Sequence, residues 1–441
     1  MDKNEKNLIV DVNEKPDLLQ WIFLSFQHVF AMFGATVLVP IMTGFPVSVA
    51  LFASGIGTLI YTFCTKKKVP VYLGSSFAYI TAVILAVEAM QGKDVPATSA
   101  AQTGLILVGL IYVVVAIVIK FIGKDWIDKL LPPIVIGPMI AVIGLGLAGS
   151  AVSSAGFVEG GDVAPMIVAI ITFLVAALIS SQAKGFLKIV PFLVAIVVGY
   201  ILSVFFGLVD FSGVKEAATF SIPSFSLPFS VPEFELPLFG TVSFSRYEFY
   251  FGPETFAILP VAIVTISEHI GDHTVLGKIC GKNFLKDPGL DKTLIGDGVA
   301  TAVSAFLGGP ANTTYGENTG VIGLTKIGSV YVTCGAAVIA IILSFCGKVS
   351  ALISSIPSCV LGGMSILLYG VIASNGLRIL IDEHVDFSKQ RNLIIASAML
   401  VIGLGGAVFP LGGSATLSGT ALAAIVGVLL NLILPDKKEE N

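Results

Sequence analysis

Long apolar runs follow one another along almost the whole chain and are separated by short polar segments. Most runs approach the roughly 20 residues that an α-helix needs to cross the hydrocarbon core of a membrane. They lack the regular alternation of polar and apolar residues that a strand of a transmembrane barrel shows. We therefore expect an all-α integral membrane protein with fourteen spans, at residues 20–42, 46–64, 70–91, 104–122, 132–151, 164–181, 189–208, 253–277, 293–307, 311–327, 329–347, 353–375, 392–411 and 416–434.

The distribution of charge supports this number of spans. Only 12% of the 441 residues are charged, whereas about 25% of a soluble domain is charged. With the N-terminus in the cytoplasm, all 25 basic residues except Lys93, Lys215, Arg246 and Lys348 fall in the tails or in inner loops, as the positive-inside rule expects. We expect a multi-pass protein of the cytoplasmic membrane with both termini inside. Its small net charge of -4 predicts no nucleic-acid partner.

Four short motifs recur, in the same order, in the two halves of the chain. Each pair is weak alone, but the offset between its members stays similar along the chain. Seven spans per half is an odd number, so the two halves must lie in the membrane in opposite orientations. This is the inverted repeat of many secondary transporters. The matched positions are Gln27 and Glu268, Gly74 and Gly316, Gly137 and Gly362, and Gly199 and Gly427.

Spans three and ten are broken at matching places, residues 69–77 and 309–317. Each segment runs from a proline through β-compatible residues to a glycine, and an apolar helix follows it. Irregular backbone at membrane depth survives only where it lines a protein cavity, and inverted-repeat transporters bind their substrate where broken segments meet. We expect the two extended pieces to cross and pair, with the following helices aiming their positive N-termini at a small substrate.

Three carboxylates lie in these apolar surroundings. Glu317 follows the break in span ten, and Glu268 and Asp272 lie four residues apart in span eight, which places them on one helix face. Acidic residues inside a membrane usually mark substrate, ion or proton pathways. We expect Glu317 and Glu268 to be functional. Asp272 lies nearer the cytoplasmic end, and a hydrated charge in an inner vestibule remains open for it.

Other polar residues in the spans have weaker signals. His269 and His273 could ligate a metal by spacing, but Ile270 stands where a zinc protease motif has Glu, so we expect no metal. One histidine is expected to orient or exchange a proton with a neighbouring carboxylate, and a packing role remains open for each. Asp297 is expected to cap a helix. Structural support is expected from Gln27, His28, Asn318 and Thr319.

Residues 209–250 differ from the rest of the chain because they are rich in Phe, Pro and Ser. They are predicted to form an extended, aromatic extracellular loop that acts as a cover. The five cysteines lie within or beside apolar segments without metal-ligand spacing, so we expect them to pack as small side chains.

The segment Glu317-Asn-Thr-Gly-Val-Ile-Gly-Leu-Thr-Lys326 resembles the signature of the nucleobase–ascorbate transporter family. That signature is an acidic residue or Gln, then Asn-x-Gly-x-x-x-x-Thr and a basic or small residue. The segments at 313–318, 72–79 and 268–271 resemble the bacterial uracil permease branch of this family. The similarity covers residues 17–435.

The resemblance implies a core domain, made of spans 1–4 and 8–11, and a gate domain, made of spans 5–7 and 12–14. The corresponding ranges are 20–128 and 129–208 for the first halves of the core and gate, 209–250 for the extracellular loop, and 251–348 and 349–435 for the second halves. It also implies a homodimer through the gate domains in the lipid bilayer.

By the same resemblance, the function is proton-coupled symport of uracil into the cell by alternating access. No cofactor is implied other than the proton as coupling ion. Substrate contacts are implied for Glu268, Glu317, Phe77, Tyr315, Gly316 and Tyr369, those of Phe77, Tyr315 and Gly316 through their backbone. We assign proton coupling to Glu268, Asp272, His273 and Glu317. A relative has His at the position of Asp272, so the coupling route here can differ in detail.

The chemistry of uracil agrees with these residues. Its ring N–H groups suit carboxylates, its carbonyls suit backbone N–H groups, and Phe77 offers an apolar wall. Within the family a purine such as xanthine is the closest alternative, to be distinguished by the size of the pocket. An anion exchanger of this architecture is less favoured because Glu268 and Glu317 would repel an anion. A membrane enzyme lacks a visible nucleophile–base pair or metal set, and a channel does not need matching broken segments.

Overall fold

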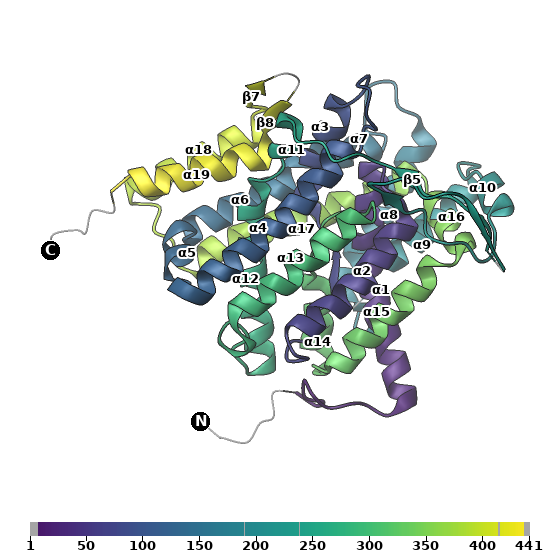
Figure 1. Cartoon of the computed structure of the whole chain (residues 1–441), viewed down its shortest axis with the longest axis horizontal. Coiled ribbons are helices and arrows are strands. Elements are labelled where there is room, and N and C mark those ends of the chain that lie inside the picture. Colours follow the sequence, from purple (N-terminus) through teal and green to yellow (C-terminus); the bar gives the residue numbers. More distant parts are fainter. Residues whose placement is uncertain (1–7, 189, 238, 413–414, 436–441) are drawn as a thin grey trace.

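Helices dominate the structure (Figure 1), as expected where lipid forces the backbone to satisfy its own hydrogen bonds. The computed structural model describes residues 8–188, 190–237, 239–412 and 415–435. Within these residues, seven helices are long and apolar enough to cross a membrane. The chain is therefore an α-helical membrane protein, as the apolar runs predicted.

The helices of the first half are α1 (Leu18–Thr43), α2 (Val47–Cys64), α3 (Ile80–Ala89), α4 (Ser99–Ile122), α5 (Asp125–Leu130), α6 (Pro133–Gly146), α7 (Ala148–Ser154), α8 (Val163–Gln182) and α9 (Pro191–Phe205). Those of the second half are α11 (Pro253–Phe256), α12 (Val261–Cys280), α13 (Leu290–Phe306), α14 (Gly316–Thr325), α15 (Val330–Ser344), α16 (Gly347–Ser354), α17 (Ser358–Asp382), α18 (Gln390–Leu404) and α19 (Gly419–Ile433). Every predicted span thus contains a helix.

The expected edges of the last two spans are wrong. Residues that we assigned to helix ends form a β-hairpin of β7 (Val408–Gly412) and β8 (Ala415–Ser418). Gly406 has a φ of +73°, and Pro410 follows within the strand, so the helical pattern cannot continue there. Spans five and eight are also interrupted, between α6 and α7 and between α11 and α12.

The two broken segments pair with each other, which confirms that part of the prediction. Strand β1 (Leu73–Ser75) lies antiparallel to β6 (Asn312–Thr314), with Gly74 opposite Thr313. Side chains from the neighbouring helices bond backbone groups on the outer edges of the strands: Ser54 Oγ donates to the carbonyl of Leu73 at 2.7 Å, and Thr301 Oγ1 donates to the carbonyl of Asn312 at 3.1 Å. The extended backbone is thus bonded both within the strand pair and to the helices around it.

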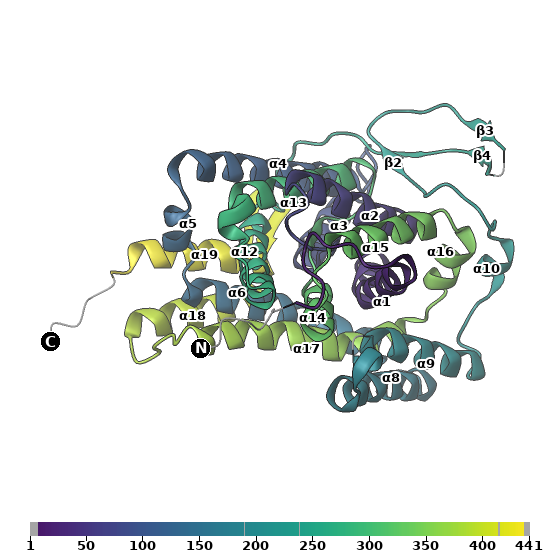
Figure 2. The same ribbon diagram turned by 90° about the horizontal axis from the view of Figure 1, so that it is seen from below.

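The helices pack into two groups, with the crossing strands in the first. In that group α13 packs on α4 and α2, and α15 packs on α2 and α1. In the second group α17 packs on α6, α7 and α8, and α18 packs on α19 and α6. Figure 2 shows α14 and α12 between α17 and the side formed by α2, α13 and α15. Small residues allow close packing within a group: a Cβ on Gly109 of α4 would lie 2.4 Å from the carbonyl of Gly298 of α13.

The segment between the two halves is extended and aromatic in its described part. It contains a short helix, α10 (Ser212–Glu216), and strands β2 (Ser226–Leu227), β3 (Phe234–Leu236), β4 (Gly240–Val242) and β5 (Ser245–Arg246). Phe225 packs edge-to-face on Phe52 of α2 with ring centroids 5.1 Å apart, and Phe239 packs on Phe345 after α15. These contacts fasten the segment to the first helix group.

Residues 8–14 cross the ends of α12 and α14. The N–H of Ile9 donates to the carbonyl of Lys326 at 2.7 Å, and the N–H of Val330 donates to the carbonyl of Val12 at 2.9 Å. Val12 is buried in one apolar cluster with Leu276 and Ile322, which come from α12 and α14. The short helix α14 is therefore tied at its far end as well as at the strand crossing.

We predict that Gly74→Ala destabilises the protein, because a Cβ at this position would lie 2.3 Å from the ring of Tyr315. Overpacking of this kind costs about 1–3 kcal/mol, and thermal unfolding in detergent should move to lower temperature. Gly146→Ala is the matched control, since a Cβ there meets nothing within 4 Å. Equal melting temperatures for the two variants would contradict the close approach at the crossing.

Candidate functional site

Two helices begin where the crossing strands end. After β1, the single turn η1 (Phe77–Tyr79) leads into α3, and after β6 the chain enters α14 at Gly316. The first N–H groups of a helix lack partners within it and carry partial positive charge. Gly316 is exposed, and a Cβ on it would meet nothing within 4 Å. Its backbone is therefore accessible to a small molecule.

Two carboxylates lie near this point. Glu317 occupies the first turn of α14 and Glu268 lies on α12, and both are half-buried. The carboxyl of Glu268 is close enough to interact electrostatically with those of Glu317 and Asp272. Among the described residues, no three His, Cys, Asp or Glu side chains lie close enough together to hold a metal ion.

An aromatic pair joins the two helix groups beside the helix starts. Phe77, half-buried at the start of η1, packs edge-to-face on Tyr369 of α17, with ring centroids 6.2 Å apart and planes at 76°. The hydroxyl of Tyr369 donates to the sulfur of Met42 at 2.7 Å. The structure thus brings these two predicted substrate residues together from opposite sides.

The polar groups of Tyr315 have hydrogen-bond partners within the protein. Its N–H donates to the carbonyl of Tyr72 at 3.1 Å, and its carbonyl accepts from the N–H of Thr319 at 3.2 Å. Its hydroxyl donates to the carbonyl of Ser75 at 3.0 Å and accepts from Thr36 at 3.1 Å. These bonds occupy its polar groups inside the protein, so Tyr315 holds the crossing in place.

Asp272 contacts the crossing directly. The hydroxyl of Thr314, the last residue of β6, donates to Asp272 Oδ2 at 2.5 Å. Asp272 is half-buried on the same side of α12 as Glu268, as the four-residue spacing predicted. The strand that leads into α14 is therefore bonded to a carboxylate of α12.

Asp297 is buried in the middle of α13, and the expectation that it caps a helix is wrong. Gly289 occupies the N-cap position of α13, and Asp297 lies two turns further on. Its Oδ2 lies 2.8 Å from Nδ1 of His269. Sequence reasoning missed this pair because its members are far apart along the chain. The available signal was an acidic residue between two glycines, Gly296 and Gly298, well inside an expected span.

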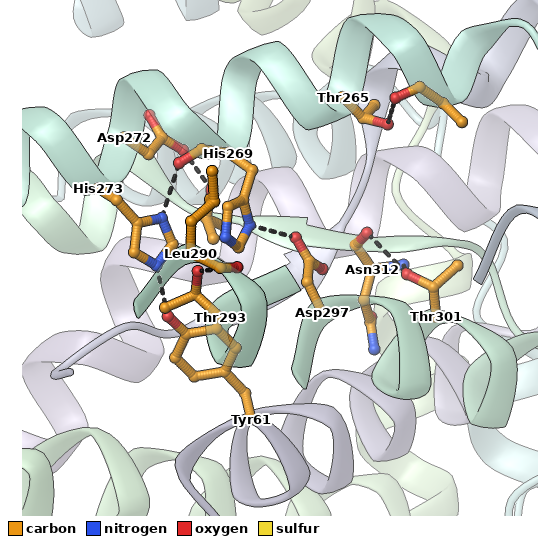
Figure 3. A network of polar contacts seen from close by, with 12 residues as sticks. Tyr61, Thr265, His269, Asp272, His273, Leu290, Thr293, Asp297, Thr301 and Asn312 are labelled. Carbon is orange, nitrogen blue, oxygen red and sulfur yellow. Dashed lines mark hydrogen bonds and ion pairs between the residues drawn. The ribbon is translucent and has the colours of Figure 1, made fainter. Parts of the chain in front are cut away.

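His273 lies one turn beyond His269, and the two rings stack with centroids 4.0 Å apart. Nδ1 of His273 donates to the carbonyl of His269 at 2.7 Å, and Nε2 contacts the hydroxyl of Tyr61 of α2. Figure 3 shows the two histidines side by side between Asp297 and Tyr61. Both ring nitrogens of His273 thus contact protein partners, whereas Nδ1 of His269 faces Asp297 and its Nε2 has no partner among the described residues.

The remaining predicted residues lie between α1 and α14. The amide of Asn318 donates to the carbonyl of His28 at 3.0 Å and lies 3.0 Å from Nδ1 of the same residue. Gln27 and Thr319 are buried nearby on the same two helices. Asn318 and His28 therefore link the first turn of α14 to the long helix α1.

Solved structures that align with this chain include a bicarbonate transporter and a solute carrier 26 protein. The transmembrane domain of a cyanobacterial bicarbonate transporter, BicA, aligns with a TM-score of 0.62 at 15% identity and covers 95% of this chain and 99% of its own. Murine solute carrier 26 member A9, an anion transporter in the inward-facing state, aligns with a TM-score of 0.67 at 12% identity over 95% and 69% of the two chains. At these identities the likeness concerns the fold alone.

Sequence relatives are much nearer. The chain is 50% identical to the uracil permease of Bacillus caldolyticus, over 98% of this chain and 96% of the relative. It is 46% identical to that of Bacillus subtilis over 99% and 98%, and 42% identical to that of Escherichia coli K12 over 96% and 93%. A family model described as the permease family matches residues 19–412. The chain therefore belongs to this family of permeases, the nucleobase–ascorbate transporters, and is a multi-pass membrane protein.

Proposed function

We propose that this protein imports uracil together with protons by alternating access. The observation that carries the proposal is the meeting of two helix N-termini and two carboxylates at the strand crossing, in a chain 42–50% identical to three proteins named uracil permease. The site has carboxylates and a helix N-terminus on one side and the ring of Phe77 on the other, which suits a planar pyrimidine.

Each group of uracil has a matching group in the site. Glu268 and Glu317 accept from the ring N–H groups, and the free N–H of Gly316 donates to a ring carbonyl. Phe77 covers one face of the ring. A site built to bond an N–H group rejects analogues that lack it, because its own buried groups then lose their partners.

Proton coupling follows from the closeness of the carboxylates. Two carboxylates that share a poorly hydrated site cannot both ionise cheaply, so one of them holds a proton. In our proposal this proton enters with the base from outside and leaves when the site opens to the cytoplasm. Asp272, held by Thr314, lies on the cytoplasmic side of Glu268 on α12 and takes part in the release.

Alternating access would move the two helix groups relative to each other. We assign residues 20–128 and 251–348 to a core that carries the crossing, and residues 129–208 and 349–435 to a gate. The contact of Phe77 with Tyr369 joins core to gate beside the substrate. All fourteen spans then cross the membrane in two inverted repeats of seven.

An anion exchanger is the second candidate, because the solved structures of this fold include anion transporters. Two positive helix ends would suit an anion. Glu268 and Glu317 would repel it, however, unless both were protonated. The carboxylates therefore favour a neutral base with N–H donors.

We predict that Glu317→Gln abolishes gradient-driven uptake of radiolabelled uracil into proteoliposomes. A charged acceptor is lost, which costs binding roughly tenfold or more, and the proton site is lost with it. Glu88→Gln is the control, since this exposed glutamate lies at the far end of α3. Uptake that persists in Glu317→Gln and still follows the proton gradient would contradict the assignment.

We predict that excess unlabelled uracil competes with labelled uracil for uptake, and that excess xanthine does not. The reason is the contact between Phe77 and Tyr369, which in our proposal closes the side of the site where a second ring would lie. Competition is measured in proteoliposomes at equal concentrations of the two bases. Stronger inhibition by xanthine would indicate that the same site binds a purine instead of uracil.

We predict that both termini and the loop at residues 65–69 face the cytoplasm. Three of the four outer basic residues are held by local partners: Lys93 pairs with Glu254 at 2.6 Å, Arg246 with Glu248 at 3.2 Å, and Lys348 with two backbone carbonyls. The hydrogen bond to Glu254 raises the pKa of Lys93. Alkaline phosphatase fused after residue 93 should be active in cells, and fused after residue 67 inactive. The opposite pattern of phosphatase activities would contradict the predicted topology.

A further inference from the structure

Helix α12 presents two different polar faces. Glu268 and Asp272 lie four residues apart on a half-buried face, whereas His269 and His273, also four apart, lie about 100° around the helix. Both histidines are 0% exposed, and so are their partners Tyr61 and Asp297. The second face is therefore a fully buried polar cluster, set apart from the place where a substrate would bind at the starts of α3 and α14.

The hydrogen bonds fix the protonation of one ring. A backbone carbonyl can only accept, so Nδ1 of His273 must carry the hydrogen that points to the carbonyl of His269. The remaining nitrogen, Nε2, is the acceptor of a neutral imidazole. The hydroxyl of Tyr61 faces that nitrogen and has no other acceptor among the described residues. Tyr61 is the donor, and His273 is neutral.

This neutral ring lies against His269, which faces Asp297 at 2.8 Å. A second positive ring 4.0 Å away would repel a protonated His269 strongly, because charges interact with little screening in a dry interior. The hydroxyl of Tyr61 occupies the one nitrogen at which His273 could take a proton. Gly296 makes room for Tyr61, since a Cβ there would lie 3.0 Å from the tyrosine ring.

The buried pair adjoins the carboxylate face of the same helix. Glu268 directly precedes His269 on α12, and Asp272 directly precedes His273. Because charges this close are screened little in a protein interior, the charge of Glu268 acts on the pair of His269 and Asp297 in our proposal. The other packed elements add few titratable groups: α6 and α19 have none. The groups near the cluster are Cys64 and Tyr61 of α2, Tyr79 of η1, Tyr112 of α4, Glu317 of α14, and Glu268 and Asp272 of α12 itself.

We propose that Tyr61 and His273 are positioning residues for proton coupling: the tyrosine hydroxyl keeps His273 neutral and oriented, and the stacked His273 holds His269 against Asp297. The inference rests on the proposed proton symport. It assigns no proton transfer to Tyr61 and no substrate contact to either residue. It predicts that disturbing the cluster uncouples transport from the proton without abolishing uracil binding.

The test uses Tyr61→Phe, which removes one oxygen, and compares two assays in proteoliposomes. Uracil exchange at equal pH on both sides needs no net proton movement, whereas gradient-driven uptake does. We expect exchange and the dissociation constant of uracil to stay within about twofold of wild type. Net uptake should fall about tenfold, the size of effect expected for an unpaired buried acceptor. Tyr247→Phe is the matched control, a buried tyrosine whose hydroxyl donates to the carbonyl of Phe306.

A double-mutant cycle tests the route of the effect. If Tyr61 acts through His273, then adding Tyr61→Phe to His273→Leu should not lower net uptake further. Additive losses would overturn the proposal, as would a Tyr61→Phe variant with normal net uptake. An equal loss of exchange and net uptake would also overturn it, because that outcome indicates only a damaged fold. A wild-type protein whose uracil uptake ignores the proton gradient would instead overturn the proposed symport, and this assignment with it.

Discussion

The structure depends on how the N–H and C=O groups of extended backbone find hydrogen-bond partners at the centre of a membrane protein. Each unpaired peptide group in an apolar medium costs several kcal/mol, and two chain segments pass through this region without helical bonds. They pair with each other, β1 with β6, and hydroxyls such as that of Ser54 complete the set. The same crossing fixes where α3 and α14 begin. The position of Glu317 and the accessible N–H of Gly316 are therefore consequences of backbone pairing.

The crossing also explains why polar side chains surround it. Thr314 bonds Asp272, and Asn318 bonds His28, so the broken segment is tied both to α12 and to α1. Hydrogen bonds of this kind contribute modestly to net stability but are costly to lose when buried. Their value here is geometric, because they hold two carboxylates from different helices near one point. A site assembled from separate elements needs such ties to keep its shape while the surrounding helices move.

The sequence was informative wherever one residue type forced the local structure. Proline and glycine at matching places in spans three and ten predicted the extended pieces, and an inverted repeat predicted that they meet. The hairpin β7–β8 was missed because its strands are as apolar as a spanning helix. The occupied backbone of Tyr315 could not be foreseen either, since only the register of β1 on β6 decides which N–H groups stay free. Asp297 and Tyr61 were missed because their partners lie on other helices, and a pattern within one helix does not show them.

The two polar faces of α12 differ in how deeply they are buried. Glu268 and Asp272 are half-buried, which in our proposal leaves them accessible to the base and to protons. His269 and Asp297 are fully buried, and the hydrogen bond between them offsets part of the cost of burying two polar groups. Because electrostatic interactions are screened little in such an interior, the proposed mechanism lets the buried pair respond to the charge of Glu268 and Asp272 without a contact to the base. The proposed symport would gain from this division, since binding groups and charge-sensing groups can then be constrained separately.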